Sequence, residues 1–217
     1  MHQKLIVPDP FITQLEKHLS VKLHEPAPKS LSEYAKVIGR VSEGLKMKKR
    51  REEFLQNSYL ENKNYRQAYL LYYTTCNLLK IYYPLAELEP SGFFGKHPTL
   101  RILDLGSGTG AMILGFSFWM KEFSTTHKIH FTACDQSAEA FRELATFYGE
   151  FNFDHAFEIR QTDLEKSLPF PEKFNGIIGG NFLNELSEAA RRNIFNILNE
   201  NLSDDGFVIF IEPERAK

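Results

Sequence analysis

The sequence predicts an α/β fold, in which a parallel sheet carries helices on both faces and follows a helical segment. From residue 100 onward, short apolar runs alternate with helical stretches, which is the rhythm of repeated β-α-β units. The first of these runs leads into a turn with glycine at alternate positions, Gly106, Gly108 and Gly110. Before residue 100, apolar residues recur at the three- and four-residue spacing of helices.

Residues 1–95 are expected to form an N-terminal helical domain. Asp9 and Pro10 open its first helix, as an N-cap residue and a proline in the first turn. Ser30 and Glu33 form a capping-box pattern, which opens the second helix. Both helices therefore begin with a start signal that is local in the sequence.

The next two helices are rich in aromatic residues. One surrounds Phe54 and Tyr59, and the longest covers residues 62–83 and is expected to end at Pro84. Spacing puts five residues of the longest helix on one face: Tyr65, Tyr69, Tyr72, Cys76 and Leu79. Such a face belongs either to the core or to a surface that stacks on nucleic-acid bases. Residues 90–98, with two prolines and two glycines, are expected to form a linker or entry loop.

Residues 96–217 are expected to form the sheet domain. The predicted strands are 100–104, 128–135, 155–161, 174–180 and 206–212. The predicted helices are 109–123, 137–148 and 187–201. In a sheet of this kind, ligands bind beyond the carboxyl ends of the strands, where the strand order reverses.

The glycine-rich turn after the first strand has the features of a nucleotide-type cofactor site. Glycine lets a ligand approach the backbone closely and permits positive φ, and the N–H groups at the start of the following helix can bind polar ligand atoms. Gly106, Gly108 and Ala111 also fit the dinucleotide pattern G-x-G-x-x-G/A. Asp104 favours S-adenosylmethionine instead, because a carboxylate two residues before the first glycine can meet a cationic amino group.

The later strand ends carry matching polar residues. Asp135 ends the second strand and can accept hydrogen bonds from two vicinal ribose hydroxyls. It lies 29 residues after Gly106, whereas the acidic residue of a dinucleotide site lies about 20 residues on. Asp163 follows the third strand and either accepts the adenine amino group or caps a turn. Asn181, Asn184 and Glu185 follow the fourth strand, where a methyl acceptor would arrive.

Residues 98–217, and LDLGSGTG above all, resemble the class I S-adenosylmethionine-dependent methyltransferases. The resemblance implies a Rossmann-like class I methyltransferase sheet. A sheet of that family normally has two strands beyond the five predicted here, so the resemblance also implies that the sheet of this chain lacks the last strands. The turn would line the methionine and ribose portion, Asp135 would take the ribose hydroxyls and Asp163 the adenine edge. The implied cofactor-binding residues are Asp104, Gly106, Ser107, Gly108, Gly110, Asp135, Asp163, Asn181 and Phe182.

A narrower resemblance, to the ribosomal small-subunit methyltransferase-like family of bacteria and mitochondrial ribosome assembly, rests on other segments. These are residues 66–73 with Asn77 and Lys80, residues 181–186, and residues 211–213. This family implies ribosomal RNA as the acceptor. The chain departs from the family at Glu214, where glycine is usual, and in lacking a downstream cysteine cluster that binds metal. We expect no metal site.

The net charge of −2 conceals an asymmetry between the two parts of the chain. Residues 1–100 carry 15 Lys and Arg against 10 Asp and Glu, and residues 101–217 carry 11 against 18. The basic residues gather at Lys46, Lys48, Lys49, Arg50 and Arg51. This cluster either contacts the phosphates of RNA or a ribosomal subunit, or is a solvated helix face. With two distant cysteines, no signal peptide and no membrane-length apolar run, we expect a cytoplasmic protein.

The sequence leaves the catalytic residues unassigned. Methyl transfer needs mainly proximity and orientation, and it needs a base where the acceptor must lose a proton. Glu185 either acts on an acceptor or is a charge at a helix start. Two other functions compete with the methyltransferase: a non-catalytic ribosome-assembly or RNA-binding factor that keeps the cofactor fold, and an NAD-dependent oxidoreductase.

Overall fold

The computed structural model describes residues 5–23, 29–46, 54, 59–123, 128–166 and 170–213. Its centre is a parallel five-stranded sheet in the order β3-β2-β1-β4-β5. The strands are β1 (Thr99–Leu105), β2 (Lys128–Asp135), β3 (His155–Gln161), β4 (Phe174–Gly180) and β5 (Leu202–Ile211). The strand order reverses at the β1/β4 boundary, which is where such sheets bind ligands. The predicted α/β, Rossmann-like fold class is confirmed.

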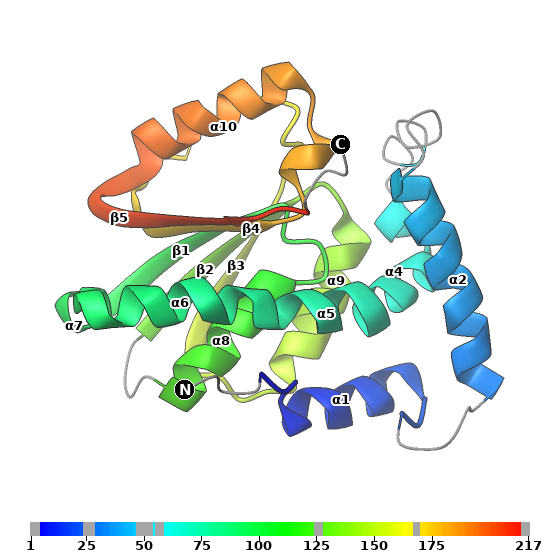
Figure 1. Ribbon diagram of the computed structural model, residues 1–217. Coiled ribbons are helices and arrows are strands. Elements are labelled where there is room, and N and C mark those ends of the chain that lie inside the picture. Colours follow the sequence, from blue (N-terminus) through cyan, green and yellow to red (C-terminus); the bar gives the residue numbers. More distant parts are fainter. Residues whose placement is uncertain are drawn as a thin grey trace.

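Helices cover both faces of the sheet (Figure 1). Helix α10 (Glu188–Asn201) lies on one face, and α8 (Ala111–Phe123) and α9 (Ala138–Gly149) lie on the other. Alternation along β1 separates the two cores, because successive side chains point to opposite faces. Leu100 and Ile102 join the larger core under α8, whereas Leu103 and Leu105 join the smaller core under α10.

The N-terminal helices pack onto the face that α8 and α9 already cover (Figure 1). Phe11, Leu78 and Leu85, all fully buried, belong to the same apolar cluster as Ile102 of β1. This cluster crosses residue 95, where the sequence predicts a boundary, and the division into two domains stays a prediction. The elements are α1 (Asp9–Leu19), α2 (Lys29–Lys46), η1 (Tyr59–Glu61), α4 (Lys63–Tyr69), η2 (Leu70–Thr74), α5 (Thr75–Leu78), η3 (Leu79–Ile81), α6 (Tyr82–Leu88), η4 (Glu89–Ser91) and α7 (Phe93–Lys96).

The expected continuous helix over residues 62–83 is wrong in detail. The chain passes from α4 into a π-helical turn, η2, and then through α5 and a 3₁₀ turn, η3. These turns change the number of residues per turn and so rotate later side chains out of phase. Tyr69 is half-buried, but Tyr72 and Cys76 are exposed, so the five residues do not share one face.

The prediction that Pro84 ends this helix is also wrong. Pro84 is the third residue of α6, where the first-turn N–H groups have no intrahelical acceptor, and a proline therefore costs no hydrogen bond. Residues 90–98 are not a linker either. They contain most of η4 and the whole of α7, and Phe93 and Phe94 are buried in the larger core.

Smaller differences concern where elements begin. Helix α1 has Pro8 as its N-cap residue, with no side-chain cap, so Asp9 is its first helical residue. Helix α2 begins at Lys29, one residue before the predicted cap Ser30. Strand β5 begins at Leu202 rather than at residue 206, because Leu202 already pairs with Phe174 of β4 across an irregularity. Most of the helix predicted around Phe54 lies outside the described residues. No described helix has the length and apolar character needed to cross a bilayer.

Gly115 marks the closest approach of the N-terminal helices to α8, and replacing it should destabilise the fold. A Cβ atom at Gly115 would lie 2.0 Å from the Leu78 carbonyl oxygen. We expect Gly115→Ala to lower the free energy of unfolding by about 1–3 kcal/mol in urea denaturation. Gly39→Ala in α2 is the matched control. Nothing lies within 4 Å of a Cβ there, so it should stabilise the protein by up to about 1 kcal/mol. Equal effects of the two variants would contradict the close contact.

Candidate cofactor site

The glycine-rich turn lies at the carboxyl end of β1, at the point where the strand order reverses. Gly106, Gly108 and Gly110 have φ of 69°, 50° and 84°, a region that L-residues rarely adopt. A Cβ atom at Gly110 would lie 2.2 Å from Leu144 Cδ1, and one at Gly106 would lie 2.5 Å from Phe182 Cβ. Both backbone conformation and space therefore require glycine at positions 106 and 110.

Hydrogen bonds clamp this turn to the end of β2. The Ser107 hydroxyl donates to the Asp104 carbonyl oxygen at 2.9 Å and accepts the Cys134 N–H at 3.0 Å. Asp135 Oδ2 accepts the Gly108 N–H at 2.9 Å. The turn is thus held from the side of β2, which lies on the flank of β1 away from β4.

Asp104 is the most unusual residue of the site. Its side chain is fully buried, and neither carboxyl oxygen has a hydrogen-bond partner among the described residues. Burial raises the pKa of its carboxyl well above the ordinary value; the nearby Ser107 hydroxyl, which donates to the Asp104 main-chain oxygen, opposes the shift, and the negative charge of Asp135 adds to it. Because a buried polar group without a partner costs free energy, this carboxyl marks a place for a ligand that supplies a cation or a donor.

Asp135 already serves the backbone of the site. Oδ1 accepts the Ser137 N–H at 2.9 Å, and Oδ2 accepts that of Gly108. Burial raises the pKa of this carboxyl, although the backbone donors oppose the shift. A carboxylate can accept about four hydrogen bonds, so Asp135 retains capacity for ligand hydroxyls.

Asp163 has local partners in the turn after β3. Its Oδ1 accepts the Glu165 N–H at 3.0 Å, and its Oδ2 lies 3.2 Å from Lys166 Nζ. These contacts match the turn cap that the sequence allows as one of two roles. A contact with an adenine edge stays a prediction.

The turn after β4 is held by a residue that sequence reasoning missed. Glu212 Oε1 accepts the N–H groups of Phe182 and Leu183 at 3.1 and 3.0 Å, and Oε2 accepts Asn184 Nδ2 at 2.9 Å. Asn181, at the start of this turn, has φ 61° and donates its N–H to the Ile211 carbonyl oxygen at 2.8 Å. The signal in the sequence was an acidic residue, Glu212, directly after the last strand, because a carboxylate there can accept from the N–H groups of the turn after β4.

Phe182 is buried against the glycines of the site. Its side chain is 5% exposed and belongs to the core under α10. A Cβ atom at Gly179 would lie 2.4 Å from its Cε1 atom. Phe182 therefore fills the space that the glycines leave, and its expected contact with a cofactor stays a prediction.

The N-terminal helices contribute directly to the site, which the sequence did not predict. Thr74 and Thr109 join their hydroxyls at 2.5 Å, and Leu60 Cδ1 would lie 3.5 Å from a Cβ atom at Gly108. The rings of Tyr59 and Tyr69 lie 5.9 Å apart, centroid to centroid. Burial raises the pKa of both phenols, and the negative charges of Glu185 and Asp135 add to it.

Other predicted features have no structural description or no counterpart. Lys48, Lys49, Arg50 and Arg51 lie outside the described residues, and only the backbone of Lys46 is described. Within the described ranges, no group of three or more His, Cys, Asp or Glu side chains could hold a metal ion.

No protein-family model and no curated protein matches this sequence. Several solved structures match part of it. PKMT2 from Rickettsia typhi in complex with AdoHcy has 16% identity and a TM-score of 0.43, over 52% of this chain and 21% of that one. An S-adenosylmethionine-dependent methyltransferase from Clostridium acetobutylicum has 16% identity and a TM-score of 0.44, and the match covers 61% of this chain and 48% of that one. The DhpI-SAM-HEP complex has 20% identity and a TM-score of 0.41, and the match covers 68% of this chain and 65% of that one.

The chain therefore spans less than two thirds of each of these three structures. With TM-scores below 0.5, none of them identifies what this chain binds. The class that the fold and the site define is a Rossmann-like protein with a nucleotide-type cofactor turn.

The buried Asp104 carboxyl gives a test of the site in the protein alone. Since its pKa is raised in the folded state, folding becomes less favourable as the pH rises above about 4, where the unfolded chain ionises this group. We expect Asp104→Asn to be at least as stable as the parent at pH 7, and to lose this advantage at pH 3, in urea denaturation. The control Asp163→Asn keeps an acceptor for the Glu165 N–H and removes only the exposed ion pair with Lys166, so it should gain nothing at pH 7. A large loss for Asp104→Asn at pH 7 would contradict an unpartnered carboxyl.

Proposed function

We propose that this chain is an S-adenosylmethionine-dependent methyltransferase. The observation that carries the proposal is the unpartnered, buried Asp104 carboxyl beside three glycines in left-handed conformation. The residues present suit this cofactor: Asp104 for its ammonium group, the backbone from Gly106 to Gly110 for its methionine portion, and Asp135 for its ribose hydroxyls. A dinucleotide would instead bring its anionic pyrophosphate to this turn, where the buried Asp104 carboxyl offers it no cation.

The bound cofactor supplies an electrophilic methyl group on a sulfonium. The chain's own residues bind and orient it, and this positioning is the main contribution that such a displacement needs. Ser107 and Asp135 fix the turn on one side, and Glu212 fixes the segment after β4 on the other. In the N-terminal layer, Tyr59 and Tyr69 contribute hydroxyls whose pKa is raised by burial.

We further propose RNA of the ribosomal small subunit as the acceptor, with the protein in the cytoplasm. The support is the basic cluster Lys46, Lys48, Lys49, Arg50 and Arg51 together with the resemblance of residues 66–73 and 181–186 to the ribosomal methyltransferase-like family. Basic side chains supply the sequence-independent part of RNA affinity by releasing counterions from phosphates.

Calorimetric titration tests the cofactor directly. We expect the chain to bind S-adenosylmethionine and S-adenosylhomocysteine but not NAD. Asp135→Ala should weaken both affinities by about 1–3 kcal/mol, since it removes charge-assisted hydrogen bonds to the ribose. Asp163→Ala is the comparison variant, because the described partners of its carboxylate lie in its own turn. Absence of binding by all three ligands would favour a non-catalytic scaffold, and binding of NAD alone would favour an oxidoreductase.

The RNA proposal has its own test in the salt dependence of binding. Reversing the charges of Lys48, Lys49 and Arg50 to Glu should flatten the slope of log affinity against log salt by roughly 0.7 for each phosphate that the variant no longer neutralises. The measurement is a filter-binding titration of small-subunit RNA fragments between low and physiological salt. A slope equal to that of the parent would make the cluster a solvated helix face.

A further inference from the structure

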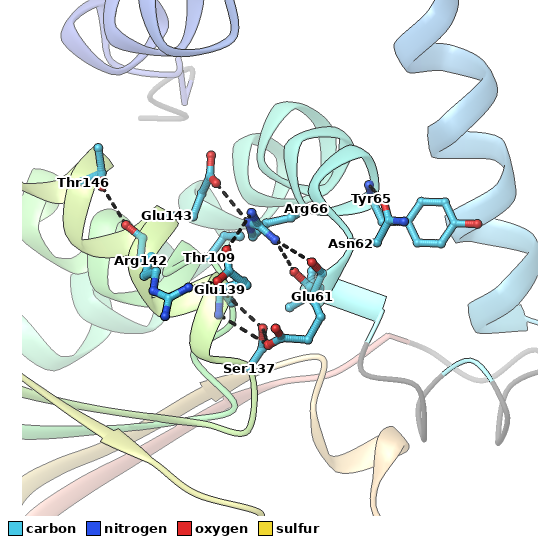
Figure 2. Close-up of polar contacts among 12 residues, drawn as sticks. Glu61, Asn62, Tyr65, Arg66, Thr109, Ser137, Glu139, Arg142, Glu143 and Thr146 are labelled. Atoms are coloured by element: carbon cyan, nitrogen blue, oxygen red, sulfur yellow. Dashed lines mark hydrogen bonds and ion pairs between the residues drawn. The ribbon is translucent and has the colours of Figure 1, made fainter.

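A buried arginine joins the N-terminal helices to the start of α9 (Figure 2). Arg66 is 6% exposed and donates to four acceptors. Its Nη1 atom donates to the carbonyl oxygens of Leu60 and Glu61 at 2.7 and 3.1 Å. Its Nε atom donates to Glu143 at 3.0 Å, and its Nη2 atom to Glu139 at 3.3 Å. A buried guanidinium with these acceptors holds the backbone of η1 firmly against α9.

The α9 side of this contact is reinforced by a histidine. His18 Nε2 of α1 lies 2.5 Å from the other carboxylate oxygen of Glu143. Burial alone would raise the pKa of Glu143, but the hydrogen bonds from His18 and Arg66 lower it below its ordinary value. Glu143 is thus held as a carboxylate, which suits it to anchor Arg66.

With its backbone fixed in this way, η1 directs two side chains toward the cofactor turn. Leu60 covers Gly108. Glu61 Oε1 accepts the Ser137 hydroxyl at 2.7 Å and the Glu139 N–H at 3.4 Å. Both of these hydrogen bonds use Oε1, and the Glu61 residue is exposed at the edge of the site.

The Glu61 carboxylate thereby reaches the corner that Asp135 occupies. Ser137, which donates its hydroxyl to Glu61, donates its backbone N–H to Asp135 Oδ1. The charge of Glu61 contributes to the raised pKa of Asp135, as expected for two carboxylates close together. A vicinal diol would relieve the repulsion between the two carboxylates, because it has two O–H donors and can donate one hydrogen bond to each carboxylate.

We propose that Glu61 is a second ribose-binding carboxylate, which shares the vicinal hydroxyls of a nucleoside cofactor with Asp135, and that Arg66 is its positioning residue. Glu61 Oε2 takes one hydroxyl and Asp135 takes the other. The N-terminal helices therefore read the cofactor as well as facing the acceptor. This inference rests on the proposed function, since it requires a cofactor with a ribose.

The test uses S-adenosylhomocysteine and its 2′-deoxy and 3′-deoxy analogues with the full chain, by calorimetry. In the parent we expect removal of either hydroxyl to weaken binding about tenfold. In Glu61→Gln, the penalty for one of the two analogues should fall to less than twofold. A purely structural role would weaken all three ligands in proportion and leave both penalties unchanged, which would overturn the proposal.

Two control variants separate contact from charge and from folding. Glu139→Gln removes a charge at the same helix start, but it keeps an amide oxygen to accept from Arg66 Nη2 and the backbone N–H that donates to Glu61, so both penalties should stay near tenfold. Equal effects of Glu139→Gln and Glu61→Gln would show a general field effect and overturn the proposal. If the parent binds no S-adenosylhomocysteine, the proposed function fails and this inference fails with it.

Arg66→Met tests the positioning role, with Arg142→Met as its match. Arg142 forms an ion pair with Glu139 as well, but it is exposed and contacts no part of η1 among the described residues. We expect Arg66→Met to abolish the loss of affinity for the same deoxy analogue as Glu61→Gln does. The double variant Arg66→Met/Glu61→Gln should show no further change, because Arg66 acts through Glu61. Retention of both penalties in a folded Arg66→Met would exclude Arg66 as the positioning residue, and Glu61→Gln would still test the contact itself.

Discussion

The hydrogen bond from the Gly108 N–H to Asp135 Oδ2 is the contact on which the arrangement of the site depends. It fixes a turn whose glycines leave no side chains of their own to hold it, and it does so from the neighbouring strand. Parallel pairing of β1 with β2 from Thr99↔Lys128 to Leu105↔Cys134 brings the two strand ends level, so that the contact can form. Leu60, Thr109 and Phe182 then pack around a turn that is already in place.

The N-terminal helices are part of this site and not an appendage to it. Their apolar residues continue the core of the sheet, and their polar residues end at the cofactor turn. Arg66 is the residue that positions η1 as well as packing against it. Its donors fix the backbone of η1, and the direction of the Leu60 and Glu61 side chains follows from that.

The strands could be predicted from sequence because their signals are local. Apolar runs ending in Asp135, Gln161 and Gly180 gave β2, β3 and β4 with the bounds that the structure has. The irregular helix before β1 could not be predicted. Its π and 3₁₀ turns depend on tertiary packing, such as the close approach of Leu78 to Gly115. No local sequence pattern indicates such a contact. The roles of Glu212 and Arg66 could not be predicted for the same reason. The partners of Glu212 lie 28 to 30 residues away in the sequence, and one partner of Arg66 lies 77 residues away.

The site concentrates negative charge, and this bears on any acceptor. The carboxylates of Asp135, Glu61 and Glu185 act electrostatically on groups of the site, and residues 101–217 as a whole carry 18 acidic against 11 basic residues. A phosphate entering this site would be repelled, whereas an ammonium group or a nucleobase amino group would be attracted. If RNA is the proposed acceptor, its phosphates are therefore held away from this site, and an uncharged base can enter it.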